Sequence, residues 1–361
     1  MTDKQTLRQQ IDSLDEQLVS LLNQRQALAK AIGEIKNQQS LETLDPEREQ
    51  QVLAHLQQCN TGPLSPEALN NIFREIISAA RQIQIPLKVA FLGPEATFTH
   101  LAAIKRFGRS SQFGPLPTIQ DVFFEVEKGK YHLGVVPIEN STEGVVNDTL
   151  DLFVQTPLKV CGEIYLEISH DLISRTGQRQ DIEIIYTHPQ AFAQCRQWLR
   201  ANLPEIPVMD VRSTGVAAQK AAQNPNSAAI ASSFAASLYD LRVVEPRIEN
   251  HRGNATHFFI IGPQSQGQTG ADKTSMIFGV DDVPGALYNM LRPLAERRIN
   301  MTRIVSRPIK TVAWRYLFFV DLDGHGEEEP VQGCLAEMER LSVFFKIMGS
   351  FPRSETVEKI S

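Results

Sequence analysis

The hydrophobic pattern of this chain changes at Pro86, and this change constrains the fold more than any other feature. Before Pro86, apolar residues recur at spacings of three and four, which is the period of an α-helix. After it, short β-prone runs alternate with helical stretches, beginning with Lys88 to Leu92. A chain of 361 residues is also too long for one ordinary core. We therefore expect a multidomain protein whose first part is all-α.

The first predicted helix carries an apolar seam that a cation interrupts at Arg25. A guanidinium on such a seam is costly unless it is paired, so Arg25 either sets the helix register or binds an anion. Lys36 returns to nearly the same face three turns later, whereas Arg8 lies roughly 100° away and suits a partner subunit's site better. The seam consists of Leu7, Ile11, Leu14, Leu18, Leu21, Leu28, Ile32 and Ile35.

Two further helices are predicted before Pro86. Asp45 with Pro46 has the form of a helix start, and Ser65 with Pro66 repeats it. Taken singly, the polar residues of these helices would be solvated surface. Together with Arg25 and Lys36 they describe a basic, hydrogen-bonding pocket without a nucleophile. They are Arg48, Glu49 and, at the end of the third apolar face, Gln84.

This combination resembles the all-helical chorismate mutases over residues 1–86. The resemblance implies an intertwined dimer, or a higher homo-oligomer, whose substrate is chorismate. Its Claisen rearrangement needs no acid, base or covalent step, only a dicarboxylate held in a compact conformer by cations and donors. The implied contacts are Arg8 (in the partner's site), Arg25, Lys36, Asp45, Arg48, Glu49, Ala80 and Gln84. Arg25, Lys36, Glu49 and Gln84 are the expected catalytic residues, with Lys36 and Gln84 at the ether oxygen and Glu49 at the ring hydroxyl.

Position 80 departs from this family, because many relatives have serine where this chain has Ala80. The change removes a minor contact and leaves the resemblance intact.

Beyond Pro86 the pattern predicts an α/β fold with a substantially parallel sheet. We expect strands at 88–92, 133–138, 183–187, 208–211 and 228–231, and helices near 119–128, 190–200, 214–223 and 232–239. Polar residues follow four strands, where α/β folds bind ligands. Serine and threonine there can be helix caps, but capping does not explain Glu139 and Asn140 directly after a buried strand.

Residues 87–264 resemble the prephenate dehydratases through Gly93 to Phe98, Pro137 to Gly144 and Asn254 to Phe258. The resemblance implies two α/β lobes, like periplasmic ligand-binding proteins, with the site between them. Prephenate would lose water and carbon dioxide to give phenylpyruvate. The implied contacts are Thr97, Phe98, Glu139, Asn140, Ser141, Glu143, His188, Gln190, Ser213, Thr214, Thr256 and Phe258.

Thr256 is the motif threonine and the expected contact of the leaving hydroxyl. A threonine is no strong acid at neutral pH, so Glu139, Glu143 and His188 stand as alternative proton donors. Relatives carry arginine where this chain has His257. Since side chains alternate along a strand, His257 should point away from Thr256 and serve as a support, touching the other lobe or a neighbouring domain.

Residues 273–352 show the order βαββαβ of a ferredoxin-like module. They resemble the ACT regulatory domain, which implies L-phenylalanine as an effector bound at Gly285, Ala286, Leu287, Ser306, Arg307 and Pro308. Val305 replaces the glutamate that normally begins the second of these motifs. The alternative is a purely structural dimerisation module.

Composition excludes several classes of protein. The net charge of −6 argues against nucleic acid or an anionic membrane as a partner, and no signal peptide or membrane span is evident. Four scattered cysteines favour a cytoplasmic protein, and nothing suggests a metal or cofactor. We expect a bifunctional mutase and dehydratase under phenylalanine control. The alternatives are a mutase fused to a non-catalytic sensor, and a dehydratase that uses arogenate.

Overall fold

The computed structural model describes residues 3–38, 46–308, 316–354 and 356–359. The chain divides into two compact units. The first comprises residues 1–88 with 107–112, and the second comprises residues 89–106 with 113–361. None of the helices in the described ranges is long and apolar enough to cross a membrane.

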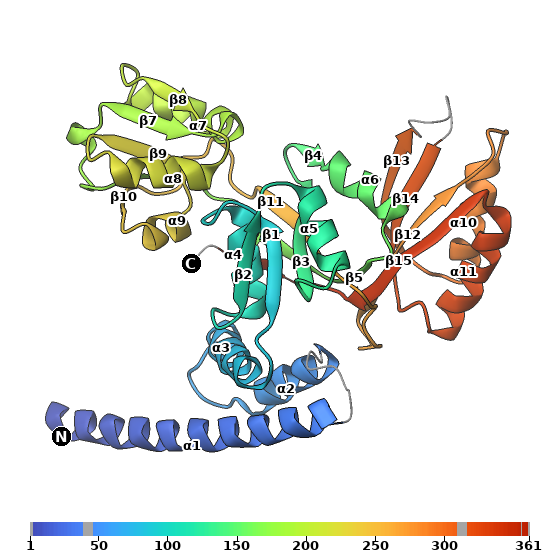
Figure 1. Ribbon diagram of the computed structural model, residues 1–361, viewed down its shortest axis with the longest axis horizontal. Coiled ribbons are helices and arrows are strands. Elements are labelled where there is room, and N and C mark those ends of the chain that lie inside the picture. The colour runs from blue at the N-terminus through green and yellow to red at the C-terminus, as the bar shows by residue number, and fades with distance from the viewer. Residues whose placement is uncertain (1–2, 39–45, 309–315, 355, 360–361) are drawn as a thin grey trace. The chain divides into compact units, whose positions relative to one another are not determined.

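The first unit contains the three predicted helices, α1 (Lys4–Gln38), α2 (Pro46–Cys59) and α3 (Pro66–Gln84). Ser65 caps α3, since its side chain accepts a hydrogen bond from the backbone N–H of Ala68. Helix α3 packs against both α1 and α2 (Figure 1). Most of the apolar seam of α1 is exposed, with values from 48% at Leu7 to 68% at Leu28. This helix therefore presents an apolar surface that the single chain leaves uncovered.

The second unit contains two mixed sheets besides the sheet of the C-terminal module. One has the order β16-β5-β11-β3-β1-β2, with β4 paired to β3. Its strands are β1 (Lys88–Leu92), β2 (Gln112–Leu116), β3 (Leu133–Asn140), β4 (Gly144–Val145), β5 (Lys159–Glu167), β11 (Ala255–Gly262) and β16 (Val357–Glu358). The accompanying helices are α4 (Phe98–Phe107), α5 (Ile119–Glu127) and α6 (Asn147–Gln155).

The other sheet has the order β10-β6-β9-β7-β8. Its strands are β6 (Asp171–Ser174), β7 (Ile184–Thr187), β8 (Val208–Asp210), β9 (Ser227–Ala231) and β10 (Arg242–Glu245). Its helices are α7 (Pro189–Asn202), α8 (Thr214–Gln223) and α9 (Ser233–Leu238), and residues 179–181 form a 3-10 turn.

The predicted strands and helices of this region are present, and β1 pairs in parallel with β3, as β7 does with β8 and β9. Both sheets are nevertheless mixed, because they also contain antiparallel strands. Strand β11 runs antiparallel to both of its neighbours, β3 and β5, and β6 runs antiparallel to β9 and β10. Those antiparallel strands return from distant parts of the chain, so local alternation of strand and helix could not reveal them.

Residues 272–352 form the predicted βαββαβ module. Its strands are β12 (Asp272–Gly279), β13 (Met301–Pro308), β14 (Tyr316–Asp323) and β15 (Phe344–Pro352), in the order β13-β14-β12-β15. The sequence pattern predicts that the third strand of this module begins at Trp314, and this residue lies outside the described residues. Helices α10 (Ala286–Glu296) and α11 (Glu329–Leu341) cover one face of this sheet (Figure 1).

The opposite face of that sheet shares a hydrophobic core with the preceding domain. Ile277, Phe319 and Met348 belong to one buried cluster with Phe153 of α6 and Val160 of β5. Backbone approach is close here, because a Cβ built on Gly349 would lie 2.2 Å from the carbonyl oxygen of Val160. The C-terminal module is therefore packed against the dehydratase-like part, rather than joined to it only by a linker.

Candidate active sites

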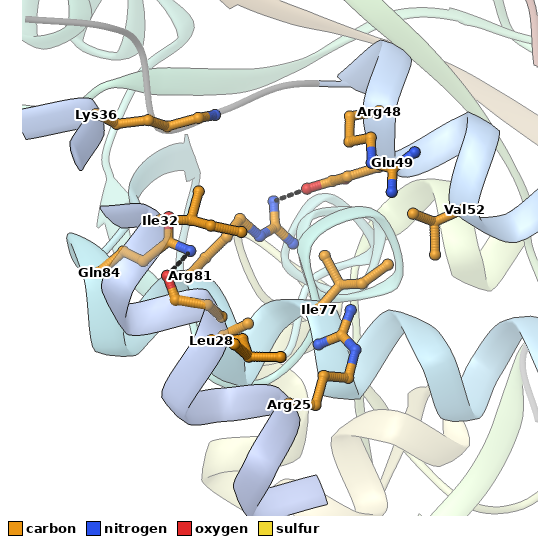
Figure 2. Close-up of a pocket in the computed structure, with 12 residues that line it drawn as sticks. Arg25, Leu28, Ile32, Lys36, Arg48, Glu49, Val52, Ile77, Arg81 and Gln84 are labelled. Atoms are coloured by element: carbon orange, nitrogen blue, oxygen red, sulfur yellow. Dashed lines mark hydrogen bonds and ion pairs between the residues drawn. The ribbon is translucent and has the colours of Figure 1, made fainter. Parts of the chain in front are cut away.

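The helical unit encloses a pocket of about 440 Å³ between its three helices (Figure 2). Five of the predicted contacts line it together with Ala80: Arg25 and Lys36 from α1, Arg48 and Glu49 from α2, and Gln84 from α3. Apolar side chains complete the wall, among them Leu28, Ala29, Ile32, Val52 and Ile77. The pocket thus combines cations and amide donors with apolar walls, as a small dicarboxylate requires.

Arg25 is a half-buried cation of this pocket. Its Nη1 atom is buried and has no hydrogen-bond partner among the described residues. Burial lowers the pKa of its guanidinium, which records the cost of keeping this charge away from water. An anionic ligand would supply the missing acceptor, so the ligand interpretation of Arg25 is favoured over the register interpretation.

Three further contacts fix the polar side chains of this pocket. Gln84 donates from Nε2 to the carbonyl oxygen of Ala29 over 2.8 Å, which leaves the second hydrogen of this amide for a ligand. Nη1 of Arg81 lies 3.6 Å from Oε1 of Glu49, while Nη2 of Arg81 donates to the Phe107 carbonyl over 2.7 Å. Sequence reasoning missed Arg81, although its position four residues after Ile77 places it on the buried face of α3.

Arg8 does not line this pocket. It lies seventeen residues before Arg25 on the same helix, about 25 Å away along the axis. It therefore cannot contact a ligand in its own chain's pocket. Asp45 lies outside the described residues.

A hydrogen-bonded polar cluster lies at the carboxyl end of β3. Asn140 donates from Nδ2 to Oγ1 of Thr256 over 2.8 Å, and the two residues are paired across β3 and β11. Oδ1 of Asn140 accepts from the Glu143 amide at 3.1 Å, which orders the loop after the strand. Ser141 donates to Oδ1 of Asn254 at 3.0 Å. The structure thus brings together the predicted residues Asn140, Ser141, Glu143 and Thr256.

Gln194 and His170 also belong to this cluster, and both were absent from the predicted contacts. Gln194 of α7 reaches Oε1 of Glu143 with Nε2 at 3.5 Å, and its Oε1 lies 2.8 Å from Nε2 of His170. Burial lowers the pKa of His170, which favours the neutral ring. Gln194 follows Gln190 by one helical turn, and that spacing was the available signal.

The remaining polar strand ends serve as helix caps. His188 accepts through Nδ1 from the amide of Gln190, and Ser213 accepts from the amide of Val216 directly before Thr214. Thr97 precedes α4 and accepts through Oγ1 from the amide of His100 at 3.3 Å.

Phe98 contacts the polar cluster. Its ring packs edge-on against His170, with the ring centroids 5.5 Å apart. The start of α4 is thereby in contact with His170, which in turn contacts Gln194.

Two predicted contacts lie elsewhere. Glu139 is paired with His257 on the face of the sheet opposite to Asn140 and Thr256, and its Oε2 accepts from Nε of Arg303 at 2.9 Å. The side chain therefore points to the C-terminal module and not to the polar cluster. Phe258 is 1% exposed and fully buried. Because side chains alternate along a strand, Glu139 lies on the face opposite to the polar cluster. Phe258 is too deeply buried to contact a ligand there.

His257 points away from Thr256, as expected for a supporting residue. Its ring stacks on Tyr165 with centroids 4.2 Å apart, and Nε2 lies 2.9 Å from Oε2 of Glu163. Lys273 of β12 also pairs with Glu163, at 3.0 Å. Burial alone would raise the pKa of Glu163, but the hydrogen bond and charge of His257 and the charge of Lys273 lower it overall.

The six predicted effector residues fall on two elements of the C-terminal module. Gly285 has φ of 83° and caps α10, whose first residues are Ala286 and Leu287. The second motif lies on β13, with Ser306 and Pro308 exposed. Arg307 pairs with Asp151 of α6 at 2.6 Å. Val305 is partly buried and packs on the shared core, so an apolar residue is suited to this position.

An all-α unit with a pocket lined by cations, a two-sheet α/β part and a βαββαβ module define a multidomain enzyme with a regulatory domain. Family models agree with each part. Chorismate mutase type II matches residues 7–85, prephenate dehydratase matches residues 89–266, and the ACT domain matches residues 274–340. The chain belongs to the family of bifunctional chorismate mutase/prephenate dehydratases.

Relatives support this membership over nearly the whole chain. A bifunctional chorismate mutase/prephenate dehydratase from Aquifex aeolicus is 44% identical over 358 residues, covering 98% of this chain and 99% of the relative. One from Pseudomonas aeruginosa is 43% identical over 96% of this chain and 97% of the relative. The crystal structure of an Arthrobacter aurescens prephenate dehydratase in complex with L-Phe is 32% identical, with a TM-score of 0.68, and covers 76% of this chain and 93% of that one.

Proposed function

We propose that this chain rearranges chorismate to prephenate and then converts prephenate to phenylpyruvate, under feedback inhibition by L-phenylalanine. The observation that carries the first step is the unpartnered, buried Nη1 of Arg25 in a pocket that also holds Lys36 and Arg48. The mutase domain would comprise residues 1–86, the dehydratase domain 87–264 and the ACT domain 273–352.

In the mutase step, the protein would hold chorismate in its reactive conformer. Arg25 and Arg48, with Arg8 of the partner subunit, would bind the two carboxylates as charge-assisted pairs. Lys36 and the free amide hydrogen of Gln84 would stabilise the negative charge that develops on the ether oxygen as its bond breaks. Glu49, which pairs with Arg81, would accept a hydrogen bond from the ring hydroxyl. Asp45 would be a further substrate contact. No proton or electron needs to move between protein and substrate.

In the dehydratase step, the ring hydroxyl leaves as water while the ring carboxylate leaves as carbon dioxide. Thr256, oriented by Asn140, would donate a hydrogen bond to the departing oxygen. Backbone and side-chain donors at the helix starts, including Thr97, Ser213 and Thr214, would bind the carboxylates.

The geometry supports two of the three candidate proton donors for this step. Glu139 points away from Thr256, which favours Glu143 and His188 among the predicted donors. The contacts of Glu143 and Asn254 with Gln194 support adding Gln194 to the substrate-binding set.

The ACT domain would bind L-phenylalanine near Gly285, Ala286, Leu287, Ser306, Arg307 and Pro308. The Arthrobacter relative was crystallised with L-Phe, which supports this choice of effector. The packing of the ACT sheet on the dehydratase core gives inhibition a physical route.

The exposed apolar seam of α1 supports a homodimer, or a higher oligomer built from it. The apolar seam residues from Leu7 to Ile35 are 48% to 68% exposed. A second copy of the helix would cover them. Arg8 is too far from its own pocket and would complete the partner's. A cytoplasmic location is supported by the four free cysteines, and cell fractionation tests it.

Incubation of the purified full-length chain with chorismate tests the proposal. We expect phenylpyruvate to accumulate and L-phenylalanine to slow its formation. Prephenate accumulating without phenylpyruvate would instead identify a mutase fused to a sensor. Parallel turnover of prephenate and arogenate then decides the substrate, and faster turnover of arogenate would overturn the choice of prephenate.

A further inference from the structure

Neighbouring residues of β3 connect the polar cluster to the ACT domain. Asn140 faces Thr256, while Glu139 points to the other side of the sheet. Oδ1 of Asn140 also accepts from the backbone and hydroxyl of Thr142, at 3.0 and 2.7 Å. Any shift of Glu139 along or across the strand must therefore displace the amide that orients Thr256 and orders the following loop.

Arg303 of β13 binds Glu139 from the ACT domain. Its Nε donates to Oε2 of Glu139 at 2.9 Å, and its side chain is 11% exposed. Nη1 and Nη2 are buried and make no hydrogen bond within the described ranges. A buried guanidinium with few partners depends strongly on the one acceptor it has, so this contact resists small displacements of either strand.

A second acceptor lies close to the same guanidinium. Oδ2 of Asp321, on the neighbouring strand β14, is 3.8 Å from Nη1 of Arg303. Both carboxylates and Arg303 line a polar cavity of about 360 Å³, together with His257 and Lys273. The cavity gives the side chain room to exchange one carboxylate for the other, whereas the apolar remainder of the interface is closely packed.

The predicted effector motif is on the same strand. Ser306 follows Arg303 by three residues on β13, and this strand is at the edge of its sheet, with β14 as its neighbour. An edge strand can move with fewer broken hydrogen bonds than a central one. Effector binding at residues 306–308 would thus act on the strand that carries Arg303.

We propose that Arg303 is a positioning residue for dehydration: paired with Glu139 it holds Asn140 and Thr256 in the active arrangement, and effector binding transfers it to Asp321. This inference rests on the proposed dehydratase function and on the proposed effector residues. It adds the pair through which they communicate. Inhibition then consists of releasing Glu139, without any contact between effector and substrate.

The test is steady-state dehydration of supplied prephenate by the full-length protein, with and without L-phenylalanine. Arg303→Ala should lower kcat about tenfold or more, with little change in KM, because the substrate contacts remain but Thr256 is misplaced. Glu139→Gln should have a similar effect, and the double variant should be no worse than either single one. Arg303→Lys should restore part of kcat.

Inhibition gives an independent readout. L-phenylalanine should still bind Arg303→Ala, as measured by calorimetry, but should inhibit its remaining activity far less than in the wild type. Asp321→Asn should keep kcat and also weaken inhibition, because it removes the second acceptor. Mutase turnover with chorismate should be unchanged in all of these variants.

Lys346→Met is the matched control, because Lys346 is another ACT-domain cation that reaches the dehydratase domain. Its Nζ donates to the carbonyl oxygen of Phe153 at 2.7 Å, on α6 and not on β3. This variant should keep both kcat and inhibition. An unchanged kcat in Arg303→Ala, equal losses in Arg303→Ala and Lys346→Met, or additive losses in the double variant would each overturn the inference. A wild-type protein that does not dehydrate prephenate would overturn the proposed function as well.

Discussion

Nδ2 of Asn140 lies 2.8 Å from Oγ1 of Thr256, and this hydrogen bond joins two residues separated by 116 positions in the sequence. The bond fixes the direction of the threonine hydroxyl, because Oγ1 is the acceptor and its own hydrogen is left to donate. Asn140 in turn depends on Glu139 for its place on β3. The proposed dehydration chemistry therefore depends on the pairing of β3 and β11.

Replacing Thr256 should separate the two activities. Thr256→Ala removes the hydroxyl from a position that is 9% exposed, and we expect kcat for prephenate to fall about 10²-fold. Thr256→Ser keeps the hydroxyl and should retain most activity, while chorismate turnover should not change in either variant. Separate assays with supplied prephenate and chorismate measure both effects. Unchanged phenylpyruvate formation in Thr256→Ala would remove this residue from the site.

Variants of Arg25 and Arg8 should complement each other if each pocket uses Arg8 of the partner subunit. Arg25→Ala and Arg8→Ala alone should each lose about 10²- to 10³-fold in mutase kcat. Mixing the two chains under exchanging conditions gives hybrid dimers with one intact pocket, which should restore about a quarter of wild-type activity. Dehydration of prephenate is the control and should persist. Two inactive variants that stay inactive when mixed would contradict the shared pocket.

The substitution His257→Arg should alter stability more than catalysis. His257 is 6% exposed, stacks on Tyr165 and points away from Thr256. The longer guanidinium overfills this space, so we expect a loss of about 1–3 kcal/mol in the free energy of unfolding. Urea denaturation measures this loss, and prephenate kinetics should stay near wild type. A large rise in turnover would show that residue 257 acts on the substrate.

His100 should make the dehydratase domain sensitive to acid. It is buried against Phe91, Phe113 and Phe234, and burial lowers its pKa to about 4 from the usual 6.5. Between these two pH values the unfolded chain binds a proton that the folded protein does not. The free energy of unfolding should therefore fall by up to about 3 kcal/mol as the pH is lowered through this window.

Urea midpoints measured from pH 7 to pH 4 test the role of His100, with His100→Gln as the matched variant. Glutamine keeps an acceptor for the amide of Ala96 but does not titrate, so its acid loss should be smaller. Equal slopes for both proteins would assign the acid loss to other groups.

A methyl group at Gly349 should weaken the union of the ACT and dehydratase domains. The added Cβ would meet the Val160 carbonyl at 2.2 Å, and backbone on both sides leaves no flexible side chain to yield. We expect Gly349→Ala to lower the free energy of unfolding by about 3 kcal/mol. Gly333→Ala is the control, because this position is exposed on α11 and should gain up to about 1 kcal/mol. Thermal unfolding compares the two variants.

Local patterns in the sequence were sufficient for the helices, the βαββαβ order and the cationic seam position of Arg25. Each depends on periodicity within one element, and an amphipathic helix must bury the face its sequence makes apolar. Alternation along a strand likewise predicted that His257 and Thr256 point in opposite directions. The family motifs predicted that Asn140 and Thr256 contact the same substrate, and the structure joins them by a hydrogen bond.

Tertiary structure alone decided which residues from distant elements meet. Arg81 and Gln194 reach their sites through packing of helices, and Glu139 leaves its predicted site because β3 pairs with β11 in one register. The antiparallel strands β11 and β6, which make both sheets mixed, were not predicted for the same reason. Pairing between strands over a hundred residues apart is set by total burial and hydrogen bonding, which no local spacing records. The sequence determined what each element is, and the tertiary structure decided that Arg303 of the ACT domain binds Glu139, next to Asn140 on β3.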